Sequence, residues 1–175
     1  MTWERVRIHP YEPYRTTWLR IGAAFLDGLI LLPLGWLDVW INAAVSDRGA
    51  LAVWIIFYSF SYYGYSILMH ARYGQTIGKR ICRIAVLDLS LAPLRAGQAV
   101  RRDLVPMVLT ATGLLLQALA GDEASTLVVL FSFTWSIWML LELLTMFTNV
   151  KRRALHDLIA GSVVVRVRPQ DVDRR

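Results

Sequence analysis

The sequence contains almost no cysteine, and long stretches of it contain no positive charge. Cys82 is the single cysteine among 175 residues. This excludes an intrachain disulfide and a cysteine-rich metal site. Lysine and arginine are absent from residues 21–47, 49–71 and 103–150, although the chain has 19 of them. Because 56% of the residues are apolar, an ordinary soluble fold is disfavoured.

The residue patterns that catalysis, metal binding or nucleotide binding require are also missing. His9, His70 and His156 lie in separate segments and form no metal-binding triad in the sequence. No Ser-His-Asp or Cys-His set is indicated, and no glycine-rich phosphate loop follows a strand. We therefore expect that the protein is not an enzyme and binds neither a metal nor a cofactor.

Four apolar runs are long enough to cross a bilayer as helices, which requires about 20 mostly apolar residues. They cover approximately residues 18–45, 50–69, 104–120 and 126–147. The first run is too long for a secretory signal, contains Asp27 and Asp38, and is followed by no small-residue cleavage site. The sequence predicts an all-α polytopic membrane protein with four transmembrane helices.

The positions of the basic residues predict the orientation of these helices. Eighteen of the 19 lysines and arginines lie in residues 1–20, 70–103 and 148–175, and only Arg48 lies in the other two connectors. Basic residues near helix ends stay in the cytoplasm. We expect a bacterial inner-membrane protein with both termini and the central loop in the cytoplasm. The chain then divides into a cytoplasmic segment (1–17), a transmembrane domain (18–167) and a charged tail (168–175).

The net charge of +6 is accounted for by this topology and by attraction to anionic lipid of the inner leaflet. We therefore expect no nucleic acid as a partner. The expected partners are anionic inner-leaflet lipid and a second copy of the chain or another membrane protein.

Two short segments on the predicted cytoplasmic side are typical of β-strands. Residues 81–87 and 162–167 are rich in β-branched side chains. A single strand has unpaired backbone groups, so we expect the two to pair as a small cytoplasmic β element. Residues 151–160 predict a short amphipathic helix at the lipid interface, ended by Gly161.

Ionisable residues inside membrane spans are costly and point to a functional site. Asp27 lies seven residues after Arg20, roughly 10 Å deeper in the membrane, and Glu142 lies at a similar depth from the other direction. Tyr62 and Tyr65 belong to the same predicted layer. In one interpretation, Asp27 is neutralised by Arg102 or Arg20 and stabilises helix packing. In the other, Asp27 and Glu142 bind a cation or a proton.

The central loop contains the segment Gly74-Gln-Thr-Ile-Gly78-Lys79-Arg80. Its glycines are four residues apart and precede two cations, but the spacing differs from that of a phosphate-binding loop. A turn followed by membrane-surface charge is the favoured interpretation, and anion binding is the alternative.

Three motifs in the chain resemble those of the RDD family of membrane proteins, named for one arginine and two aspartates. The segment from Arg20 to Asp27 resembles the first-helix signature, and the segment from Gly74 to Arg80 resembles the loop motif. The segment Arg153-Ala-Leu-His156-Asp157-Leu-Ile-Ala-Gly161-Ser-Val-Val-Val165 is similar to the C-terminal motif, with Asp157 as the second aspartate. Asp103 departs from the asparagine that usually follows the arginine in this family.

The resemblance covers residues 16–166 and implies little about activity. Transport of unidentified ligands has been suggested for the family, some members are similar to sodium/proton exchangers, and a eukaryotic relative is an assembly factor. Our first hypothesis is a transport or cation/proton exchange component in which Asp27 and Glu142 bind the ion, while Arg20 and Arg102 tune their acidity. The alternative is a non-transporting scaffold or assembly subunit, in which Arg20, Asp27 and Asp157 hold the helices to the cytoplasmic elements.

Overall fold

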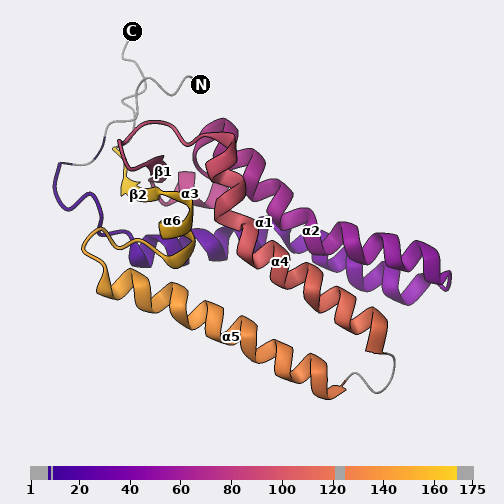
Figure 1. Cartoon of the computed structure of the whole chain (residues 1–175). Coiled ribbons are helices and arrows are strands. Elements are labelled where there is room, and N and C mark those ends of the chain that lie inside the picture. Colours follow the sequence, from indigo (N-terminus) through magenta and orange to yellow (C-terminus); the bar gives the residue numbers. More distant parts are fainter. Residues whose placement is uncertain (1–7, 9, 121–124, 169–175) are drawn as a thin grey trace, which may run out of the picture.

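The computed structural model of the protein describes residues 8, 10–120 and 125–168, and it contains four long helices (Figure 1). These are α1 (Thr17–Ala44), α2 (Arg48–Tyr73), α4 (Ala96–Ala120) and α5 (Ser125–Thr148). Each is long and apolar enough to cross a membrane. The predicted fold of four apolar helices with a small sheet is confirmed. Residues 1–7 and 9 of the predicted segment 1–17, and residues 169–175 of the predicted tail 168–175, lie outside the described residues.

Two of the long helices extend further into charged sequence than the hydropathy predicts. Helix α4 begins at Ala96 rather than at residue 104, so Arg101 and Arg102 belong to it. Helix α2 continues to Tyr73 and ends at Gly74, which has the left-handed φ of 59°. Backbone hydrogen bonding does not stop where hydropathy falls, because a long cationic side chain can carry its charge out of hydrocarbon.

The surfaces of the long helices are apolar. In an apolar 18-residue window of each candidate span, only 6–11% of the residues are buried within the chain, and large side chains such as Phe25, Trp36 and Leu140 are exposed. In water, this exposure would cost about 25 cal/mol for each Å² of apolar surface. Contact with lipid removes that cost, so the exposed side chains agree with four membrane spans.

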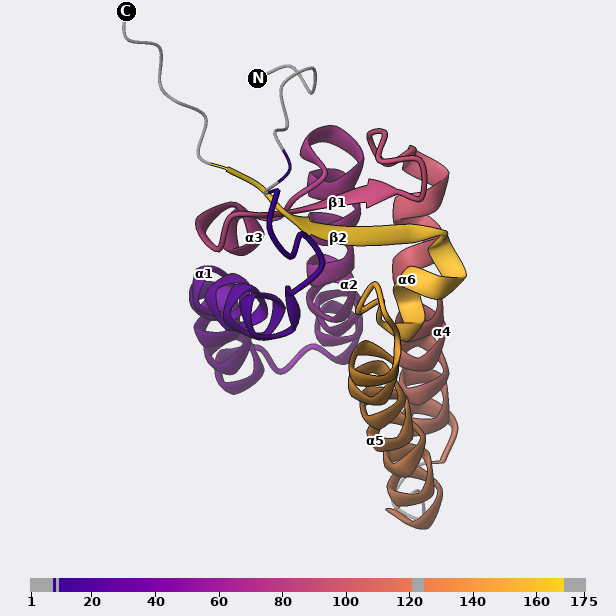
Figure 2. The ribbon, with the colours of Figure 1, turned by 90° about the vertical axis from the view of Figure 1, so that its left-hand side faces the viewer.

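A small polar and apolar unit, here called the cap, lies at one end of the long helices (Figures 1 and 2). It consists of α3 (Ile77–Ile81), β1 (Ile84–Asp88), α6 (Leu155–Ala160) and β2 (Ser162–Arg166). The two strands pair in antiparallel fashion. This confirms the predicted pairing of residues 81–87 with 162–167. The first strand starts only at Ile84, because α3 occupies residues 77–81 and Arg83 has a positive φ of 55°.

The strand pair is buried on both faces. Val86 and Val164 face a cluster that includes Ala23 of α1 and Ala99 of α4. The opposite face packs against the segment before α1 and contains Leu87, Val163 and Val165. Burial on both faces explains why these strands contain apolar runs rather than an alternating pattern.

The predicted helix over residues 151–160 is wrong in its first half. Helix α6 begins at Leu155, whereas Arg152 has a left-handed φ of 47° and its N–H bonds to the carbonyl of Asn149. The Asp157 carboxylate accepts a hydrogen bond from the Ala154 N–H at 3.1 Å. This contact satisfies one free N–H at the helix start and places the boundary there.

Candidate functional site: a polar layer between the helices and the cap

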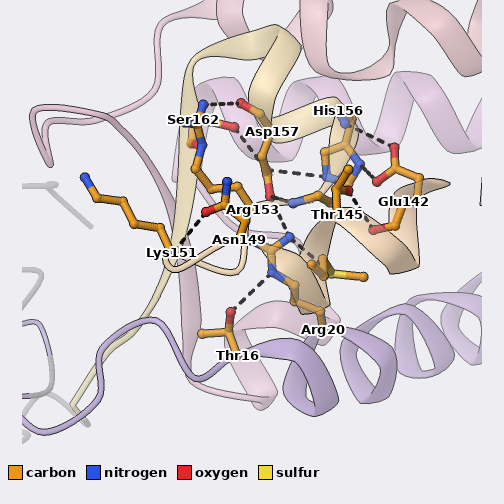
Figure 3. Close-up of polar contacts among 12 residues, drawn as sticks. Thr16, Arg20, Glu142, Thr145, Asn149, Lys151, Arg153, His156, Asp157 and Ser162 are labelled. Atoms are coloured by element: carbon orange, nitrogen blue, oxygen red, sulfur yellow. Dashed lines mark hydrogen bonds and ion pairs between the residues drawn. The ribbon is translucent and has the colours of Figure 1, made fainter.

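Asp157 of α6 is the centre of a buried ion cluster where the long helices meet the cap (Figure 3). Its side chain is fully buried. Oδ2 lies 2.5 Å from Nη1 of Arg20 on α1, and Oδ1 lies 2.9 Å from Nη1 of Arg102 on α4. The Ser162 hydroxyl donates to Oδ1 at 3.0 Å. The contact with Arg102 has ion-pair distance but lacks hydrogen-bond angles. One carboxylate therefore joins two transmembrane helices to α6 and β2.

The two arginines keep Asp157 ionised. Burial alone would raise the pKa of this carboxyl group, but the charges of Arg102 and Arg20 hold the pKa well below its usual range. Because Asp157 stays charged at neutral pH, its electrostatic contact with Arg20 and Arg102 is permanent.

A second contact extends this cluster to α5 (Figure 3). Nδ1 of His156 lies 2.7 Å from Oε2 of Glu142, and Nη2 of Arg102 lies 2.8 Å from His156 Nε2. A guanidinium only donates, so Nε2 is the acceptor and the imidazole proton is on Nδ1. The 3.5 Å approach of Nε2 to Asp157 is then not a hydrogen bond. The two arginines balance Asp157 and Glu142, so the charges of the cluster cancel.

Asp27 of α1 occupies a separate site, where its partners come from α2, from the start of α3 and from the residue before α3. It is 2% exposed and accepts three hydrogen bonds from uncharged donors. The Tyr65 hydroxyl and the Gly78 N–H donate to Oδ1, both at 2.8 Å, and the Thr76 hydroxyl donates to Oδ2 at 2.6 Å. Thr76 precedes α3, and its Oγ1 also accepts from the N–H of Lys79 at 3.3 Å. Asp27 thus holds the start of α3 against α1.

Gly78 is the point of closest approach between α3 and α1. A Cβ atom at this position would lie 2.2 Å from the carbonyl oxygen of Ala23 and 2.9 Å from Cγ of Asp27. Only glycine fits here. In the segment Gly74–Arg80, residues 74–76 form the predicted turn after α2, and α3 begins at Ile77 and docks on α1. That its cations form a membrane-surface charge stays a prediction. Lys79 is half-buried, and its Nζ lies 2.7 Å from Nε2 of His70.

The structure does not place Asp27 and Glu142 in one site, and within residues 8, 10–120 and 125–168 it does not pair Asp27 with an arginine. Arg20 and Arg102 both pair with Asp157. Among the described residues, Asp27 and Glu142 share no hydrogen-bond or ion-pair partner. The prediction grouped residues by depth along each helix, but helix rotation sends their side chains to different neighbours.

The remaining predicted residues have more limited contacts. Tyr65 contacts Asp27, whereas Tyr62 is 41% exposed and its ring lies 6.0 Å from that of Tyr63. Gly161 ends α6 with a left-handed φ of 64°. Arg80 is exposed.

Sequence reasoning did not identify three side chains that complete the layer, namely His70, Thr76 and Ser162. Thr76 has a usable signal, because a threonine directly before a short helix is a preferred N-cap residue. His70 has none, since its partner Lys79 is brought to it only by the docking of α3.

The fold and this layer define the class of the protein: a multi-pass helical membrane protein with a small cap joined to its spans by buried polar contacts. The RDD family model matches residues 14–161, so the chain belongs to the RDD family. The match contains Arg20, Asp27 and Asp157 and confirms the resemblance seen in the three motifs. No curated protein and no solved structure matches the chain.

The different environments of Tyr65 and Tyr62 lead to a prediction. We expect Tyr65→Phe to lower the free energy of unfolding by about 1–2 kcal/mol, since its hydroxyl both donates to Asp27 and accepts from the Ile77 N–H. Tyr62→Phe, the matched control, should change it by less than about 0.5 kcal/mol. Denaturant titration in detergent micelles measures both. Equal losses in the two variants would contradict the assigned contacts.

Proposed function

We propose that this protein is a non-transporting scaffold or assembly subunit of a membrane complex, with the cap in the cytoplasm. The observation that carries the proposal is the use of α1 as an anchor for both halves of the cap. Arg20 holds the α6–β2 half through Asp157. Asp27 holds the α3–β1 half through Thr76 and Gly78. Two residues on one helix therefore support the whole unit.

The donor set of Asp27 favours anchoring over ion binding. A cation needs oxygen ligands with free lone pairs, but the Gly78 N–H points its proton at Oδ1. The backbone amide cannot turn away unless α3 leaves α1. Asp157 is in turn occupied by two arginines. Both carboxylates therefore use their oxygens to hold cap residues in place, which leaves fewer sites for coordinating a cation.

The charge distribution supports a cytoplasmic cap and its partners. Eighteen of the 19 lysines and arginines lie in residues 1–20, 70–103 and 148–175, and the last two of these ranges contain the four elements of the cap. Basic residues near span ends favour the cytoplasmic side and attract anionic inner-leaflet lipid. The exposed apolar faces of α4 and α5 offer area for a second copy or another membrane protein.

Cation/proton exchange is the second candidate. It is favoured by one observation: among the described residues, Asp27 has three uncharged donors and no ion pair with lysine or arginine. Such a carboxylate could exchange a proton for a cation if the hydroxyl oxygens of Tyr65 and Thr76 turned their lone pairs toward the cation. Four spans are few for a transport pathway, so this function would require an oligomer.

The variant Asp27→Asn distinguishes the two candidates. In a scaffold, the amide keeps the acceptor for Tyr65 and Gly78 but loses the charge, so we expect a loss of about 1–2 kcal/mol in unfolding free energy. We expect no cation-dependent proton flux from the wild type in proteoliposomes containing sodium, potassium or neither.

The control is Asp38→Asn, which removes a half-buried charge from the far half of the same helix, where Asp38 accepts from Trp54 rather than from the cap. The Asp38→Asn substitution should leave the protection of the cap backbone amides from hydrogen exchange unchanged. Wild-type sodium-dependent flux that disappears in Asp27→Asn, with stability unchanged, would establish the exchange function instead.

A further inference from the structure

His70 and Lys79 meet at the edge of the polar layer, where the loop after α2 brings α3 back toward the helices. His70 is 1% exposed, and its Nε2 lies 2.7 Å from Nζ of Lys79. Its other nitrogen, Nδ1, lies 2.7 Å from the carbonyl oxygen of Ser66 and 3.2 Å from Oγ of the same residue. Both imidazole nitrogens are therefore engaged.

These partners determine where the protons are. A backbone carbonyl only accepts, so the proton of the neutral imidazole is on Nδ1 and the Nε2 lone pair faces Lys79. If His70 and Lys79 were both charged, two N–H donors would face each other at 2.7 Å with no acceptor between them. The pair can therefore hold one excess proton, but not two.

We propose that His70 and Lys79 form a single-proton binding site that couples pH to the docking of α3 on α1. The proton-binding group is the Lys79 amine, and His70 is its fixed acceptor. The ligand is a proton from the side of the membrane on which the cap lies. The site would bind a proton whether the protein is a scaffold or an exchanger.

Several charged groups from other elements face this site. Helix α4 contributes Arg102 and Asp103, α1 contributes Arg20, and α6 contributes Asp157 and His156. Asp27 holds the start of α3 itself. Burial, followed by repulsion from Arg102, lowers the pKa of Lys79 from 10.5 to about 7, although Asp103 and Asp157 act in the opposite direction.

The direction of the pH effect follows from the two forms of Lys79. With α3 docked, the amine loses its proton above about pH 7, whereas a released, solvated lysine keeps it up to about pH 10.4. Between these values the released form binds one more proton. Docking should therefore strengthen as pH rises, by as much as about tenfold for each pH unit. Below about pH 7 both forms are protonated, and the dependence disappears.

The first experiment uses the wild-type chain in lipid nanodiscs with isotope-labelled lysine and histidine. The chain has only two lysines, Lys79 and the exposed Lys151, and Lys151→Arg assigns their NMR signals. We expect the Lys79 signal to titrate near pH 7. We also expect His70 to keep its Nδ1–H tautomer between pH 6 and 9. A Lys79 midpoint above about pH 9, or an imidazolium at His70 while Lys79 is charged, would overturn the proposal.

The second experiment measures the coupling by hydrogen exchange, corrected for the intrinsic pH dependence. Between pH 7.5 and 9.5, protection of the Ile77 and Gly78 amides should rise by up to about tenfold per unit. Lys79→Met keeps the aliphatic side chain but removes the proton, so protection should become independent of pH. The matched control Lys151→Met should retain the wild-type slope. A slope that persists in Lys79→Met would assign the effect to another group and refute the coupling.

Discussion

Asp157→Asn should reduce the free energy of unfolding by about 3–5 kcal/mol, the cost of breaking a buried ion pair by removing one partner. The change keeps the size of the side chain and its hydrogen-bonding capacity toward Ser162 and the Ala154 N–H. It leaves Arg20 and Arg102, which are 8% and 4% exposed, without the carboxylate between them. Two buried guanidinium ions would then face an uncharged amide, so α1 and α4 should separate from the cap.

Equilibrium unfolding in detergent micelles, followed by tryptophan fluorescence, measures this loss. The matched control is Asp47→Asn, because Asp47 is an exposed residue that caps α2 through the Ala50 N–H at 2.7 Å. Asparagine caps a helix about as well as aspartate, so the control should lose less than about 0.5 kcal/mol. If Asp157→Asn were no more destabilising than Asp47→Asn, Asp157 would not be the anchor of the cap.

Gly78→Ala is the second substitution with a large expected effect, about 3 kcal/mol. The added methyl group would lie 2.2 Å from the Ala23 carbonyl oxygen and 2.9 Å from Asp27 Cγ, and neither neighbour is the flexible end of a long side chain. Overpacking alone costs about 1–3 kcal/mol. A displaced α3 would also withdraw the Gly78 N–H from Asp27, leaving a buried carboxylate with one donor fewer.

The matched control is Gly28→Ala, on α1 next to Asp27, where an added Cβ meets nothing within 4 Å. Since alanine favours helix by about 1 kcal/mol relative to glycine, the control should be neutral or mildly stabilising. Thermal unfolding measures the stability of both variants, and hydrogen exchange measures the protection of the amides of residues 76–82 in each. Normal α3 protection in Gly78→Ala would show that α3 does not approach α1 as closely as described.

The elements of this fold follow from local patterns, whereas the site does not. Four helices and two pairing strands could be predicted because an apolar run of sufficient length, or one rich in β-branched residues, has few other ways to satisfy its backbone. The start of α6 could not, because it depends on the bond from Ala154 to the side chain of Asp157. Hydropathy likewise missed the first residues of α4, since Arg101 and Arg102 lower the local average without ending the helix.

In the polar layer too, the sequence predicted the positions of residues along each helix but not their contacts. Depth counted along each helix placed Asp27, Glu142 and the tyrosines at one level, and that count contains no information on rotation or neighbours. In the structure, Arg20 faces Asp157, 137 residues away, whereas Asp27, two helical turns further along α1, faces the loop after α2.

By itself, the sequence determined how many spans there are and which segments can lie in hydrocarbon, because transfer of apolar and charged side chains depends mainly on local composition. It also contained the three family motifs. Only the tertiary structure decided which acid meets which base, and that Lys79 reaches His70. Contacts of a few ångströms between distant segments depend on how helices rotate and dock, and a buried charge is stabilised or destabilised by the atoms that surround it.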